Sequence, residues 1–231
     1  NDSTISKSYS AQKYVNGVAS GSPITLTFTS GVSGSFTLKD NESITITGLP
    51  VGLLPTVQET VPTTEFDCNP ATGKVDLTVS STKDTADFTN TRKKGNIEVK
   101  KSVKSDVPGD YTKDFSFTIE LDDKTINTSY TGQKYDVNGV AIGSPISLTF
   151  TNGVSDSFTL KDSESLTLAD LPLGLGYTVV ESVPTEFDCN QTNGKIKQNV
   201  ATTLTTSSYT NTRKKGDIEV KKSVTSDLSA D

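Results

Sequence analysis

The chain has 231 residues, 32% hydrophobic and 22% charged, which is enough for one or two domains with a lean apolar core. Its net charge of −6 argues against nucleic acid as a partner, and its apolar runs are shorter than the roughly 18 residues that a membrane helix needs. With no His and only two Cys, His-based acid–base catalysis and most metal sites are excluded, and we expect no cofactor and no metal. The sequence also contains no Met, so we expect an interior piece of a longer protein.

The sequence repeats itself. The segment TNTRKKGNIEVKKSV at 89–103 returns almost unchanged at 210–224, and the offset is 121 residues (210 − 89). One unit is complete, at 95–215. Residues 1–94 match 122–215 and lack a counterpart of 95–121, while residues 216–231 match 95–110. We therefore expect an array in which 1–94 is a repeat without its first two strands and 216–231 is the first strand of a following or neighbouring repeat.

Alternating apolar and polar residues predict β-strands, and no segment shows the 3.6-residue period of a helix. In chain order the alternation is clearest over 97–103, 115–121, 148–150, 158–160 and 177–181. Asn16-Gly17, Asn138-Gly139 and Asn152-Gly153 are dipeptides typical of hairpin turns, and 171–174 (LPLG) reads as a loop before a strand. Short strands and turns in a unit of this length predict an all-β fold of tandem immunoglobulin-like β-sandwich repeats.

Three polar side chains fall on strand faces that the alternation assigns to the core. Lys101 is flanked at alternate positions by valines, Glu181 follows an inward Tyr-x-Val pattern, and Asn211 follows an inward Tyr. Buried charges are costly unless they are paired or neutralised. A salt bridge with a nearby amide, or strand ends that reach water, would account for any one of the three. Their joint occurrence on the first, a late and the last strand of one unit favours a reaction.

The three residue types together suit the formation of an isopeptide bond. A lysine amine that is desolvated loses its proton more readily and becomes a nucleophile, and a buried carboxylic acid can hold a proton for the amide carbonyl. Lys101 would attack the side-chain carbonyl carbon of Asn211 while Glu181 relays protons, and ammonia would leave. The event occurs once per domain, so we expect a protein that modifies itself and not an enzyme.

The sequence resembles a known family at these same positions. The segments IEVKKSV (97–103), LPLGLGYTVVESV (171–183) and YTNT (209–212) resemble the CnaB-type and pilin-type isopeptide repeats of Gram-positive surface adhesins and pili. The resemblance covers 95–215 and, without its first strands, 1–94. It implies Lys101 and Asn211 as the bonded pair, Glu181 as the catalytic carboxylate, and a secreted protein at the cell wall or cell surface.

In the first copy Glu59 and Asn90 occupy the matching positions, and the matching lysine is absent from that copy. In the last segment Lys222 matches Lys101. Lys222 would belong to a further repeat of the array or, alternatively, would bond Asn90 of another copy and give covalent polymers. Against the polymer, the counterpart of 111–121 would be missing from the joint domain.

Cys68 and Cys189 stand at the same place in the two copies, so they cannot pair within one domain. We expect buried free thiols, with a disulfide between domains or chains as the alternative. The basic runs 92–94 and 213–215 lie at the unit junctions and read as solvated linkers.

The leading hypothesis is a structural stalk or fibre repeat of a bacterial surface protein, stabilised by autocatalytic Lys–Asn bonds. Its expected partners are neighbouring repeats and possibly other copies in a fibre, without nucleic acid and without membrane contact by this segment. The alternatives are a ligand-binding adhesin module, whose host ligand the sequence does not identify, and an accessory domain of a large secreted enzyme.

Overall fold

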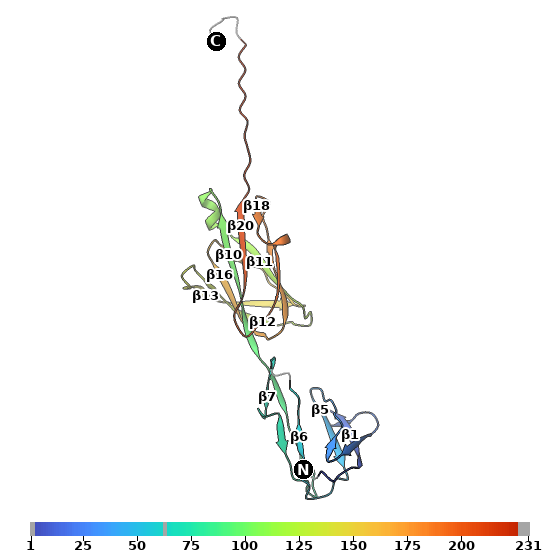
Figure 1. Cartoon of the computed structure of the whole chain (residues 1–231). Helices are drawn as coiled ribbons and strands as arrows, with labels where there is room; N and C mark the ends of the chain where they lie inside the picture. Colours follow the sequence, from blue (N-terminus) through green and yellow to red (C-terminus); the bar gives the residue numbers. More distant parts are fainter. Residues whose placement is uncertain (1–2, 62–63, 226–231) are drawn as a thin grey trace. The chain divides into compact units, whose positions relative to one another are not determined.

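The computed structural model describes residues 3–61 and 64–225, and the chain divides between Thr91 and Arg92 into two units. Both units are built from β-strands (Figure 1). Within the described residues, helix is limited to two short 3-10 turns, η1 (Pro108–Thr112) and η2 (Thr192–Gly194). The predicted all-β fold is confirmed.

The second unit is a sandwich of two β-layers joined through one long strand. The first layer follows the order β18-β20-β10-β16-β12-β13, and the second continues from β13 through β14-β11-β17-β19, with β15 beside β11. The strands are β10 (Lys94–Lys104), β11 (Phe115–Leu121), β12 (Ser129–Tyr135), β13 (Ala141–Thr151), β14 (Val154–Ser155), β15 (Phe158–Leu160), β16 (Ser165–Pro172), β17 (Gly176–Ser182), β18 (Phe187–Cys189), β19 (Lys195–Asn199) and β20 (Thr205–Arg213).

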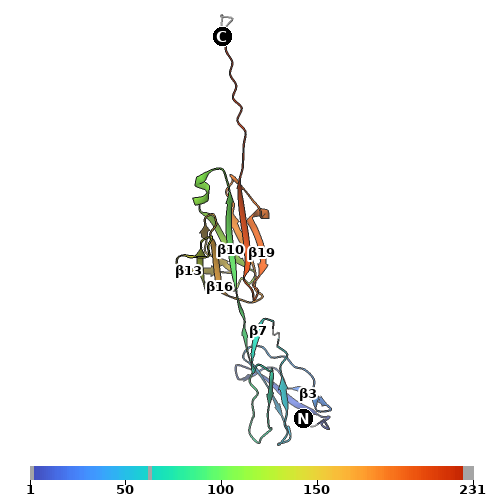
Figure 2. The same cartoon turned by 60° about the vertical axis from the view of Figure 1, so that its left-hand side comes forward.

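The strand that begins the unit and the strand that ends it are neighbours. β10 and β20 pair in parallel, with Lys101 opposite Tyr209 and Val103 opposite Asn211, while β16 pairs antiparallel with the other edge of β10. Figure 2 shows β10 and the adjoining strands along the length of the unit. Because the pairing is parallel, the chain enters β10 at one end of this unit and leaves β20 at the opposite end.

The core of the second unit follows from the alternation of side chains along the strands. On β11 every second residue is buried, which places four apolar side chains, from Phe115 to Leu121, on the inner face. The inner faces of both layers contribute to one cluster. Its members include Ile97, Val99, Phe115, Phe117, Ile119, Leu121, Phe150, Leu160, Leu166, Leu168, Tyr177, Val179, Phe187 and Tyr209.

The hairpin dipeptides form turns, with one difference between the copies. Asn152-Gly153 has positive φ at both residues, 50° and 72°, as a type I′ turn requires. Asn138-Gly139 also lies in a hairpin, but the inserted Asp136 lengthens that loop. Its Oδ1 accepts the backbone N–H groups of Asn138 and Val140 at 2.9 and 2.8 Å.

The LPLG segment differs from its prediction. Leu171 and Pro172 form the end of β16, where Pro172 is in register with Lys94, and only Leu173 and Gly174 turn toward β17. The predicted loop is therefore too long by two residues. Pro172 can occupy a strand end because a backbone N–H is not required of it there.

The first unit has the same later strands in a more open arrangement. Its strands form three separate sheets: β2-β1-β3-β4 with β5 on β1, then β6-β8, and β7-β9. The strands are β1 (Ser8–Val15), β2 (Val18–Ala19), β3 (Ile24–Thr29), β4 (Val32–Ser33), β5 (Glu42–Thr47), β6 (Thr56–Gln58), β7 (Phe66–Asn69), β8 (Lys74–Asp76) and β9 (Thr89–Arg92). Its buried apolar side chains, within the described part, are Tyr9, Ala11 and Leu26. The printed sequence of this copy has no counterpart of β10 and β11, which in the second unit lie one in each layer.

Residues 216–225 repeat the sequence of β10 but form no strand. Ile218 and Val220, which match the buried Ile97 and Val99, are 93% and 87% exposed. The prediction that 216–231 is the first strand of a following or neighbouring repeat stays a prediction, and residues 226–231 lie outside the described residues. A strand needs hydrogen-bonding neighbours, and the described chain provides none for this segment.

Candidate functional site

Lys101 lies in the interior of the second unit. The alternation along β10 buries Val99, Lys101 and Val103 on the same face, and Lys101 is 1% exposed. Its Nζ stands 4.2 Å from the centroid of the Phe115 ring. Burial lowers the pKa of Lys101, an effect that the hydrogen bond and charge of Glu181 partly offset. The environment therefore favours a lysine that gives up its proton more readily than an exposed one.

Glu181 reaches the same point from the opposite layer. It lies on β17, where the strand alternation turns it inward, and the side chains of Lys101 and Glu181 are both fully buried. Glu181 Oε1 accepts hydrogen bonds from Lys101 Nζ at 2.7 Å and from Asn211 Nδ2 at 2.6 Å. A single carboxylate oxygen thus joins the amine to the amide.

Asn211 completes the group from β20 and is fully buried. It lies two residues beyond Tyr209, the residue opposite Lys101, so its side chain shares the inner face of the layer with the lysine. Its carbonyl oxygen Oδ1 is buried and accepts no hydrogen bond from any part of the chain that the structure describes. A buried acceptor without a partner costs about 1–3 kcal/mol, and in a native fold such a group calls for an explanation.

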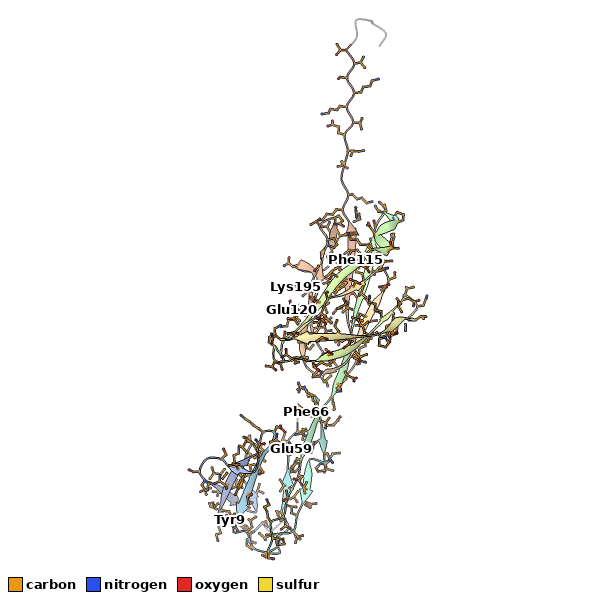
Figure 3. The ribbon with its side chains drawn as sticks, turned by 180° about the vertical axis from the view of Figure 1, so that it is seen from behind. Tyr9, Glu59, Phe66, Phe115, Glu120 and Lys195 are labelled. Carbon is orange, nitrogen blue, oxygen red and sulfur yellow. The ribbon has the colours of Figure 1, made fainter. Side chains whose placement is uncertain are left out.

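Aromatic side chains enclose the three polar groups. Phe117 and Tyr209 make an edge-to-face contact with their centroids 5.2 Å apart, and Phe115 and Phe187 make another at 5.3 Å. Phe115 lies near the end of the unit where β10 and β20 finish (Figure 3). The Tyr209 hydroxyl donates to the backbone oxygen of Val179 at 2.7 Å, and burial raises the pKa of Tyr209. The walls therefore exclude water and add no charge of their own.

A partly buried ion pair lies at this end of the unit, and the sequence analysis missed it. Asp110, in η1, is 5% exposed and accepts hydrogen bonds from Arg213 Nη1 at 3.1 Å and from Ser105 Oγ. The Arg213 guanidinium lies 5.3 Å from the centroid of the Phe187 ring. No local pattern predicts this pair, because its two members are 103 residues apart in the chain.

The prediction of a solvated linker at 213–215 is wrong for Arg213, whereas Lys214 and Lys215 are exposed and lie outside the strands. Arg213 ends β20, Lys214 Nζ donates to the backbone oxygen of Thr185 at 2.8 Å, and Lys215 Nζ lies 2.7 Å from Asp106. Nearby acidic and carbonyl groups hold the basic run against the end of the unit. In the other run, Lys94 begins β10 and Arg92 ends β9.

In the first unit, Glu59 and Asn90 are brought together in the same way. Asn90 Nδ2 donates to Glu59 Oε1 at 2.7 Å, but Asn90 is exposed and Glu59 only half-buried. Lys222 is exposed in the segment without strands. The first unit thus contains the carboxylate and the amide in contact, in a wetter setting than that of Glu181 and Asn211.

Both cysteines are free and half-buried, so the predicted full burial is wrong. Each thiol instead contacts the glutamate of its own unit. Cys189 Sγ lies 3.4 Å from Glu181 Oε2, and Cys68 Sγ lies 3.2 Å from Glu59 Oε2. The sequence analysis missed these contacts, although the identical position of the two cysteines in the repeat was a signal.

Within the described ranges, no group of three or more Cys, Asp or Glu side chains is placed to hold a metal ion. The helices found there are also too short to cross a bilayer.

Comparison with known families gives a match over both units. A family profile described as a domain of unknown function, DUF7601, matches residues 1–92 and 95–213. The chain belongs to this family. No curated protein matches the sequence.

Several solved structures are similar to this chain. The T-13 major pilin of Streptococcus pyogenes is 17% identical over 90% of each chain, with a TM-score of 0.49. The T3.2 major pilin of the same organism is 16% identical over 93% of each chain, with a TM-score of 0.48. The pilus-presented adhesin Spy0125 (Cpa) is 26% identical over 51% of this chain, with a TM-score of 0.41. The match covers 27% of that adhesin's own chain.

Proposed function

We propose that the chain is a structural repeat of a secreted bacterial surface protein, and that its second unit joins Lys101 to Asn211 by an isopeptide bond. Glu181 is the proton relay. One observation carries the proposal: in a dry, aromatic-walled site, Glu181 Oε1 binds both the lysine amine and the asparagine amide, at 2.7 and 2.6 Å. A purely structural ion pair between Lys101 and Glu181 would not require the Asn211 amide to bind the same carboxylate oxygen as the amine.

The first step is a proton transfer along an existing hydrogen bond. Lys101 Nζ passes a proton to Glu181 Oε1, which converts the ion pair into a neutral amine and a neutral acid. Burial penalises the two charges, so the neutral pair is more accessible here than in water. The amine then has a free electron pair for attack.

The second step forms the new bond. A half-turn of the Asn211 carboxamide about Cβ–Cγ brings Oδ1 to the position of Nδ2, where it accepts the proton of Glu181. The Lys101 nitrogen adds to Cγ, and Glu181 then takes a proton from that nitrogen and gives it to the departing amide nitrogen. The Cγ–Nδ2 bond breaks, the proton on Oδ1 returns to Glu181 as the carbonyl re-forms, ammonia leaves, and a secondary amide joins the two side chains. No cofactor is required, and Glu181 ends as the neutral acid formed in the first step, whose proton the departing ammonia can carry away as ammonium.

The bond would change how the unit responds to load. A pull on the two ends of this unit enters at β10 and leaves at β20, so it tends to slide these parallel strands past each other. A covalent link between them carries the force directly and leaves residues 102–210 outside its path. As a loop closure over about 100 residues, the link also stabilises the fold by up to about 4.7 kcal/mol.

The same chemistry extends to the incomplete sites. Glu59 and Asn90 would require a lysine from another segment, and Lys222 would require the glutamate and asparagine of another repeat. The described segment around Lys222 is exposed and available for pairing. In this reading every site reacts only when the first strand of a repeat is in place.

Trypsin digestion with mass spectrometry tests the proposal. In the joined product, trypsin cannot cleave after Lys101, so peptide 101–104 stays attached to peptide 198–213 and the pair is lighter by one ammonia. The Glu181→Gln variant should yield the two peptides separately, because glutamine cannot relay the proton. Separate, unmodified peptides from the unaltered protein would overturn the proposal.

A further inference from the structure

We infer that Cys189 is a positioning residue for Glu181, and that its thiol holds the carboxyl group in the orientation needed for the reaction with Lys101. This inference rests on the proposed function. Cys189 lies on β18 directly opposite Asn211 of β20, so the thiol enters the site from the strand next to the reacting amide.

The Cys189 thiol makes two contacts, one with a backbone N–H group and one with Glu181. The backbone N–H of Gln191 donates to Cys189 Sγ at 3.4 Å, and Sγ stands 3.4 Å from Glu181 Oε2. Burial raises the pKa of Cys189, so the sulfur keeps its proton at neutral pH and serves as a donor. Glu181 is thereby bound on both oxygens: Oε2 by the thiol, and Oε1 by the amine and the amide.

The first unit repeats this arrangement without the lysine. Cys68 Sγ is 3.2 Å from Glu59 Oε2, and Asn90 Nδ2 is 2.7 Å from Glu59 Oε1. The same division of the two carboxylate oxygens therefore arises from the later strands of the repeat alone. A contact that persists in the open unit does not depend on tight packing of the core or on the lysine.

A thiol suits this role because it is a weak donor. Glu181 has to accept and return a proton during the reaction. A strong donor on Oε2 would favour the charged carboxylate and hinder protonation, whereas an apolar group would leave the carboxyl group free to rotate. The S–H group fixes the orientation at little cost to proton affinity.

Reaction kinetics test the inference. The protein is made by cell-free synthesis, and urea is added to keep the chain unfolded and unreacted. Folding and reaction are then started together by dilution into buffers of different pH. Loss of ammonia is then followed by intact mass. Cys189→Val, which retains apolar volume without a donor, should react several-fold more slowly, with about tenfold as the upper limit set by one ordinary hydrogen bond, because the thiol is a weak donor. Cys189→Ser should recover most of the rate, with the alkaline limb of its pH–rate profile moved to lower pH.

Cys68→Val is the matched control, because it makes the same change beside a glutamate that has no lysine, and it should leave the rate and the profile unchanged. Near-ultraviolet circular dichroism, which reports the buried Tyr177 and Tyr209, confirms folding, and Cys189→Ala serves if the valine variant misfolds. The inference is overturned if the donor-free variant matches the unaltered protein, or if serine is as slow as valine. An unaltered protein that loses no ammonia contradicts the proposed function itself, before any variant is compared.

Discussion

At the scale of single residues, the site is unusual because three polar groups are buried as deeply as the apolar core around them, with exposed fractions of 0–3%. Strand alternation alone predicted that Lys101, Glu181 and Asn211 point inward, and in the structure they share one carboxylate oxygen. The partners of Cys189 and Asp110 could not be predicted in this way. Those contacts depend on how β18 and η1 lie against other strands, which no local pattern in the sequence encodes.

The lowered pKa of Lys101 makes a prediction for an unreactive form of the protein. In Asn211→Ala no bond can form, and the unfolded chain binds a proton at Lys101 up to its ordinary pKa near 10.5, while the folded chain releases it at lower pH. Between these two values the unfolded state binds more protons, so the free energy of unfolding should increase with pH.

Denaturant titrations at several alkaline pH values measure this slope. The double variant Asn211→Ala/Lys101→Met is the control, because the other titrating groups, including Tyr209 with its raised pKa, remain in it. The difference between the two variants should increase with pH in favour of the lysine form. A difference that is flat, or that falls with pH, would contradict a lowered pKa.

At the scale of strands and turns, more of the structure could be predicted from the sequence than at the scale of side-chain contacts. Every alternating segment is a strand, and the Asn-Gly pairs lie in hairpins. The parallel pairing of β10 with β20 could not be predicted from the sequence. The two strands are about a hundred residues apart, and the residues of a strand do not specify which other strand pairs with it. Arg213 was wrongly assigned to a linker for a related reason: its partner Asp110 comes from another part of the unit.

The start of β10 offers a test of that packing. A Cβ added at Gly95 would lie 2.2 Å from the backbone oxygen of Ala201 and 2.8 Å from Val200 Cγ1. Gly95→Ala should therefore lower the free energy of unfolding of the second unit by about 1–3 kcal/mol. Gly216, the same residue of the repeat in the unpaired segment, has nothing within 4 Å of such a Cβ. Gly216→Ala should leave the denaturation midpoint unchanged. Equal effects of the two substitutions would show that the start of β10 is not closely packed against Val200 and Ala201.

At the scale of the whole molecule, two copies of one sequence differ in how far they close. The second unit has an extensive buried core, while the described part of the first unit buries three apolar side chains. In the second unit, β10 pairs with the last strand, β20, and β11 contributes four apolar side chains to the core. A first strand therefore supplies both the lysine and the closure of its repeat, which links cross-linking to completion of the fold.

Single-molecule stretching of the full chain tests the mechanical consequence. If Lys101 and Asn211 are joined, the 109 residues from 102 to 210 cannot extend under load. In Asn211→Ala the same residues are released when the second unit unfolds, which should add one event with a contour length of about 380 Å at roughly 3.5 Å per residue. The first unit is identical in both proteins and provides an internal reference. An event of that length in the unaltered protein would show that β10 and β20 are not covalently linked, and that the second unit resists force by hydrogen bonds alone.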